Sequence, residues 1–96
     1  MYSCRVEKLV WRTPERTSGY NRLIFNLEVE SPPKIGLELS EGRWFSGPVK
    51  FVIWDMDNER FVCKADDEYP VYDRDGGFSY ERIMENYLIQ GWRAEE

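Results

Sequence analysis

The stretch Pro48–Ala65 decides the fold, and it reads Pro-Val-Lys-Phe-Val-Ile-Trp-Asp-Met-Asp-Asn-Glu-Arg-Phe-Val-Cys-Lys-Ala. Two runs rich in β-branched and aromatic residues flank Asp57 and Asn58, which both tolerate the left-handed backbone of a tight turn. The sequence therefore predicts a β-hairpin. A symmetric loop pairs unlike charges and apolar groups across the strands. This register sets Asp55 opposite Arg60, Trp54 opposite Phe61, Ile53 opposite Val62 and Val52 opposite Cys63.

Both faces of this hairpin are apolar near its middle, because side chains alternate along a strand. One face carries Val52, Trp54, Phe61 and Cys63, and the other carries Phe51, Ile53 and Val62. We therefore expect the hairpin in the centre of a sheet, at least partly covered on both sides. If Trp44 or the apolar residues of the less covered face were exposed together, a homodimer would be the leading explanation.

Further strands are predicted on both sides of the hairpin by alternating apolar residues. The segment Tyr2–Trp11 alternates until Lys8, where a bulge or the strand end is expected. The segment Arg22–Glu30 has one core face and one mostly wet face, and Leu23, Phe25, Leu27 and Val29 form the core face. Short strands are expected at residues 35–39 and 43–45.

A helix is predicted over residues 79–90, with signals at both ends. Ser79 is a favourable N-cap, and an apolar stripe follows at helical spacing. Gly91 with Trp92 is typical of a Schellman ending. The stripe consists of Tyr80, Ile83, Met84, Tyr87 and Leu88. Residues 93–96 are expected to fray.

The order of strands first and one helix last favours an α+β fold. We expect a mainly antiparallel sheet of about five strands, with the helix at 79–90 packed on one face. The alternative is a small SH3-like or OB-like barrel with a C-terminal helix. Ninety-six residues are enough for one core, so residues 1–96 are predicted to form a single domain.

Composition narrows the classes of function. The chain has a net charge of −5, contains no His, and has no apolar segment typical of a signal peptide or membrane span. We therefore expect a cytoplasmic protein without a membrane anchor or cofactor. The two thiols, Cys4 and Cys63, both lie in predicted strands and are expected to be buried and reduced, with a disulfide between them as the alternative.

The acidic loop, residues 66–77, is the predicted functional segment. Acidic patches steer cationic proteins, and tyrosines make strong contacts in interfaces. The sequence therefore predicts a non-catalytic module that binds another protein, such as an inhibitor or immunity partner of a basic protein. The predicted binding residues are Asp66, Asp67, Glu68, Tyr69, Tyr72, Asp73 and Asp75.

The basic loop, residues 12–22, gives an alternative function. It interleaves arginines with aromatic residues, as single-stranded nucleic-acid binders do. The residues concerned are Trp11, Arg12, Arg16, Tyr20 and Arg22. The overall acidity of the chain weighs against this reading, because a phosphate backbone is repelled by negative charge.

Catalysis and metal binding are weaker hypotheses. Without His, a carboxylate-pair hydrolase is the second alternative. Calcium-like runs begin at Asp55 and at Asp73, but position six of each is occupied by Arg60 and Phe78 where such loops need Gly. A hairpin turn and a solvated loop explain both runs, so no metal site is predicted.

Overall fold

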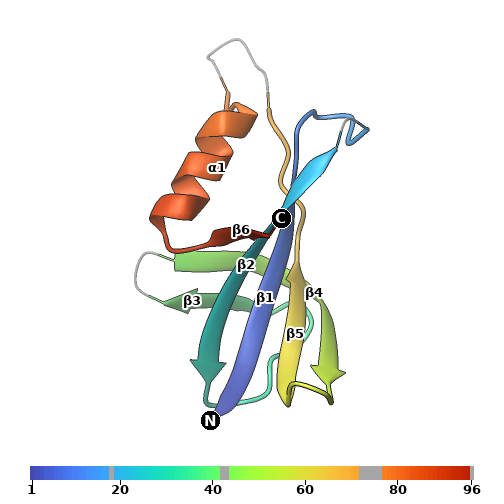
Figure 1. Ribbon diagram of the computed structural model, residues 1–96, viewed down its shortest axis with the longest axis vertical. Helices are drawn as coiled ribbons and strands as arrows, with labels where there is room; N and C mark the ends of the chain where they lie inside the picture. The colour runs from blue at the N-terminus through green and yellow to red at the C-terminus, as the bar shows by residue number, and fades with distance from the viewer. Residues whose placement is uncertain (18, 42–43, 72–76, 96) are drawn as a thin grey trace.

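The computed structural model describes residues 1–17, 19–41, 44–71 and 77–95. Within these residues the chain forms a sheet-rich fold with a mixed sheet and a C-terminal helix (Figure 1). The sheet has the order β3-β4-β5-β1-β2-β6 and curls into a half-barrel. The elements are β1 (Tyr2–Trp11), β2 (Tyr20–Val29), β3 (Glu38–Glu41), β4 (Trp44–Asp55), β5 (Arg60–Ala65), α1 (Tyr80–Ile89) and β6 (Arg93–Glu95).

The predicted hairpin and its register are confirmed. β4 and β5 pair antiparallel, with Asp55 opposite Arg60 and Val52 opposite Cys63. The Asp55 carboxylate accepts hydrogen bonds from the backbone N–H of Asp57, at 3.2 Å, and from the Asn58 side-chain amide, at 2.8 Å. An aspartate that bonds the backbone two residues ahead fixes a turn locally, so the turn residues themselves set the register.

The expectation of a mainly antiparallel sheet of about five strands is confirmed only in part, because the sheet in the described residues is mixed and has six strands. β1 pairs parallel with β5, which joins the β1–β2 hairpin to the β4–β5 hairpin. The tail that was expected to fray forms a sixth strand, β6, which pairs antiparallel with β2. The residue pattern of a strand does not indicate which distant strand it will pair with. The sequence therefore did not predict the pairing of β1 with β5 or of β6 with β2.

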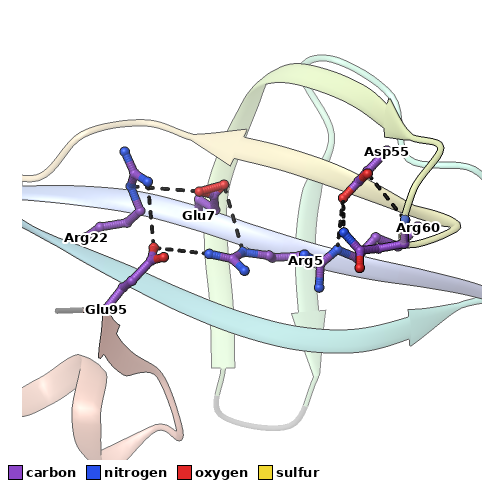
Figure 2. A network of polar contacts seen from close by, with 7 residues as sticks. Arg5, Glu7, Arg22, Asp55, Arg60 and Glu95 are labelled. Carbon is purple, nitrogen blue, oxygen red and sulfur yellow. Dashed lines mark hydrogen bonds and ion pairs between the residues drawn. The ribbon is translucent and has the colours of Figure 1, made fainter.

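The side chain of Glu95 helps to hold the tail in place (Figure 2). Its carboxylate lies 3.1 Å from Arg5 Nη2 and 3.6 Å from Arg22 Nη1. Glu7 lies between the same two arginines, at 3.9 Å from Arg5 Nε and 3.8 Å from Arg22 Nε. Alternating charges from β1, β2 and β6 therefore form one network on the face of the sheet away from α1, called the outer face below.

The core lies between the other face of the sheet and α1. Its buried residues are Cys4, Val6, Val10, Leu23, Leu39, Val49, Cys63, Ala65, Ile83, Met84, Tyr87 and Trp92. Two expectations about coverage are wrong. Ile24, on the face of β2 predicted to be mostly wet, is buried beside Glu7 and Arg93 in the sheet register. Conversely, Phe51 is 61% exposed and Ile53 51% exposed, because the core lies against only the other face of the hairpin, which carries Val52 and Cys63.

The predicted helix is confirmed, together with both of its ends. Ser79 Oγ accepts a hydrogen bond from the Arg82 N–H at 3.2 Å, as an N-cap does. At the other end Gly91 has φ +106°, and the N–H of Trp92 donates to the carbonyl of Tyr87 at 3.1 Å. This is the Schellman pattern. No helix among the described residues is both long enough and apolar enough to cross a bilayer.

Candidate functional site

The two loops that the sequence separates by charge lie side by side in the structure. The backbone of Glu68 exchanges hydrogen bonds with β1, donating to Leu9 O at 2.8 Å and accepting from Trp11 N at 2.9 Å. The indole Nε1 of Trp11 donates to the Asp67 carboxylate at 2.9 Å. The end of β1, which leads into the basic loop, is therefore fastened to the acidic loop.

The first three acids of the acidic loop each have a partner within the chain. Asp66 forms an ion pair with Lys50 at 3.2 Å, and Asp67 accepts from Trp11. Glu68 accepts from Lys8 Nζ at 3.3 Å and from the Tyr87 hydroxyl at 2.8 Å. The segment is thus partly neutralised rather than a bare anionic patch. The predicted contact residues Tyr72, Asp73 and Asp75 lie outside the described residues.

Lys8 is a buried cation, although its sequence position did not predict a site residue. Its side chain points into the core and is hydrogen-bonded to Glu68 and, at 3.1 Å, to the Tyr87 hydroxyl. Burial lowers the pKa of Lys8, and the charge of Glu68 opposes that shift. Burial also raises the pKa of Tyr87, with the Glu68 anion adding to the effect. The available signal is the interrupted alternation at Lys8. The expectation of a bulge or the strand end there is wrong, because β1 continues to Trp11 with an unbroken register against β2.

The aromatic and basic residues of the basic loop are also engaged. Trp11 and Tyr20 pack edge to face, with ring centroids 4.9 Å apart. The guanidinium of Arg12 lies over the Tyr80 ring at 5.4 Å, and that of Arg16 lies over the Tyr69 ring at 5.2 Å. These contacts connect the basic loop to α1 and to the acidic loop, so the predicted residues of both candidate sites come together.

A groove of about 720 Å³ lies where the two loops meet the sheet. It combines carboxylates and cations with the aromatic rings of Phe51 and Tyr69, which are 61% and 41% exposed. The lining residues are Glu7, Lys8, Leu9, Arg16, Arg22, Gly47, Pro48, Lys50, Phe51, Lys64, Ala65, Asp66, Asp67, Glu68 and Tyr69. Phe51 and Lys64 were not predicted as site residues. Both lie on strands, and the sequence of a strand does not show which loops will lie beside it in the fold.

Metal-ligand clusters and thiols are not found among the described residues that line the groove. Within the described ranges, no three His, Cys, Asp or Glu side chains are arranged to hold a metal ion. The two thiols lie elsewhere, buried between β1 and β5, with Cys4 Sγ and Cys63 Sγ 3.4 Å apart. Their shared hydrogen bond and burial raise the pKa of the Cys63 thiol, which disfavours its reactive anion. What remains is a recess of mixed charge with two exposed aromatic rings.

Comparison with known proteins gives the groove no assignment. Its residues and their contacts are therefore the basis for any argument about function. Neither a protein-family model, nor a curated protein, nor a solved structure matches the chain.

Proposed function

We propose that this chain is a non-catalytic protein-binding module and that its partner docks in the groove between the acidic and basic loops. The observation that carries the proposal is the placement of Tyr69, Phe51 and charges of both signs around one recess. The acidic loop, which the sequence singles out, supplies one wall of this recess through residues 66–69.

The mixed charge of the groove favours a protein partner. Protein surfaces present acids and bases at fixed spacings, so a recess with both signs can select one partner by charge complementarity. Exposed tyrosine and phenylalanine provide the apolar contact area that dominates the energy of such interfaces. Lys64 is exposed and forms no ion pair with another described residue, so its charge is available to an acidic group of a partner.

The same groove is less suited to single-stranded nucleic acid. Asp66, Asp67 and Glu68 line it and would repel phosphates. Stacking also needs free aromatic faces. Trp11 is hydrogen-bonded to Asp67 and packed on Tyr20, and Arg16 lies over the ring of Tyr69.

Affinity capture with two groove variants tests the proposal. The tagged chain is used to recover proteins from the source cells, and Lys64→Glu and Tyr69→Ala are compared with the unaltered chain. We expect each variant to lose the same co-purifying protein, because each removes a contact from the groove. Lys34→Glu is the matched control, since Lys34 is an exposed lysine outside the groove and should retain the partner.

Two outcomes would overturn the proposal. The first is an identical set of captured proteins from the unaltered chain and all three variants. The second is a salt-sensitive gel shift with single-stranded nucleic acid that Arg16→Glu abolishes, since that result would assign the basic loop to nucleic acid.

A further inference from the structure

The four carboxylates that line the groove are already bonded within the chain. The acids at residues 66–68 interact with Lys50, Trp11 and Lys8, in that order. Glu7 lies between two arginines, at 3.9 and 3.8 Å (Figure 2). A carboxylate with a partner inside the chain offers less attraction to a second molecule, because that molecule must replace or share the existing bond.

Two cations of the groove have no such partner. Lys64 and Arg16 are exposed, and neither forms an ion pair with another described residue. Glu7 lies beside Lys64 in the sheet register, but two arginines share that carboxylate. Among the described lining residues there are five cations and four carboxylates, so the groove is net positive in a chain of charge −5. The charge that the groove offers to a partner is therefore positive.

Each of these two cations lies beside an exposed aromatic ring. Phe51 is the register partner of Lys64 across the β4–β5 pair and is 61% exposed. The guanidinium of Arg16 lies over the ring of Tyr69, which is 41% exposed. A guanidinium on a ring still presents N–H groups in its plane, where a carboxylate accepts two of them. The groove therefore holds two pairs of a free cation and an exposed ring.

We infer that the partner contributes an acidic segment whose carboxylates alternate with apolar side chains. This inference rests on the proposed function and names the chemistry of the partner. The carboxylates pair with Lys64 and Arg16, and the apolar groups cover Phe51 and Tyr69. Unlike charges and buried aromatic contacts together give such a segment both specificity and affinity. The sign of charge is opposite to that of the basic partner that the acidic loop predicts.

A peptide segment fits this arrangement better than a nucleic-acid strand. A peptide can place its carboxylates at the two free cations and apolar side chains elsewhere. A nucleic-acid strand carries a phosphate at every nucleotide, so it would also bring negative charge against the acids at residues 66–68.

Selection from a library of short random peptides tests the inference. The unaltered chain is immobilised, and a chain with both Lys64→Glu and Arg16→Glu is used to remove peptides that bind elsewhere. We expect the retained peptides to be enriched in Asp and Glu next to aromatic or aliphatic residues. Enrichment of Lys and Arg instead would overturn the inference.

Fluorescence anisotropy with a labelled synthetic copy of the most enriched peptide measures the contribution of each cation. Lys64→Glu and Arg16→Glu should each weaken binding about tenfold or more. The matched controls are Lys34→Glu and Arg82→Glu, which should bind like the unaltered chain. Lys34 and Arg82 are exposed and lie outside the groove, and Arg82 is also placed over a ring, that of Phe78, at 5.0 Å.

The outcomes separate this inference from the proposed function. Basic peptides that lose binding with Tyr69→Ala would overturn the acidic segment and still support protein binding in the groove. Peptides that bind Lys64→Glu and Arg16→Glu as tightly as the unaltered chain would also overturn the inference. The affinity capture described above decides the proposed function independently, because it does not depend on the sign of the partner's charge at the other groove positions.

Discussion

At the scale of single residues, Lys8 is a charged side chain at a position where the strand places its neighbours in the apolar core. It occupies a core-facing position of β1 between Val6 and Val10, and it is 2% exposed. Desolvating an ammonium group is unfavourable, and the hydrogen bonds to Glu68 and Tyr87 offset that penalty. The three side chains connect β1, the acidic loop and α1, so one buried charge links the groove wall to the core.

Replacing Glu68 should lower the free energy of unfolding more than replacing Lys8. Glu68→Leu leaves the buried ammonium with only the Tyr87 hydroxyl and should lower the free energy of unfolding by about 2–4 kcal/mol. Lys8→Met keeps the length of the side chain and leaves Glu68 partly in water, so the change should stay within about 1 kcal/mol. Urea unfolding followed by tryptophan fluorescence measures both. Equal losses in the two variants would contradict this account.

At the scale of elements, the end of α1 depends on a single backbone conformation. Gly91 has φ +106°, which L side chains rarely adopt, and a Cβ there would lie 3.2 Å from Phe25 Cε2. The turn redirects the chain so that Trp92 enters the core and β6 reaches β2. The backbone conformation of Gly91 therefore determines where Trp92 and β6 lie in the fold.

Gly91→Ala should lower the free energy of unfolding by about 2 kcal/mol, through backbone strain and crowding of Phe25. Gly36→Ala separates the two causes. Gly36 also has a positive φ, +87°, but nothing lies within 4 Å of its would-be Cβ. Its variant should therefore cost about 1 kcal/mol from strain alone. Thermal unfolding measures both variants, and equal losses would mean that the Phe25 ring moves aside freely.

At the scale of the whole molecule, Trp92 joins the helix to the sheet. Its ring packs against Tyr87 of α1 and Phe25 of β2, with centroids at 5.5 and 5.7 Å, and it is 2% exposed. A small domain has a free energy of unfolding of only about 5–10 kcal/mol, so a large buried residue at a junction matters for the entire fold. Sheet and helix should therefore unfold together.

Trp92→Ala should remove about 3–5 kcal/mol, because it opens a cavity at this junction. The far-ultraviolet circular dichroism of helix and strands should be lost in one transition at a much lower urea concentration. Trp54→Ala is the matched control, since Trp54 is half exposed on β4 and should cost about 1 kcal/mol. A variant in which α1 melts while the sheet persists would show that the two parts are not cooperative.

The sequence by itself determined the features that depend on neighbouring residues. These are the β4–β5 register, set by the Asp55 turn, and the two ends of α1, set by Ser79 and Gly91. Turn chemistry, capping and periodicity act over a few residues, so they can be read directly from the chain. For the candidate site, the sequence likewise pointed to residues 66–69 and to Arg16 and Arg22.

Only the tertiary structure decided how these pieces combine. It placed β1 parallel to β5, paired the tail with β2, buried Lys8 and exposed Phe51 and Ile53. It also brought the acidic and basic loops together and added Lys64 to their groove. Each of these outcomes depends on contacts between segments far apart in the chain. Which of these contacts form depends on the relative free energies of alternative pairings in the whole fold. A pattern of neighbouring residues does not contain that information.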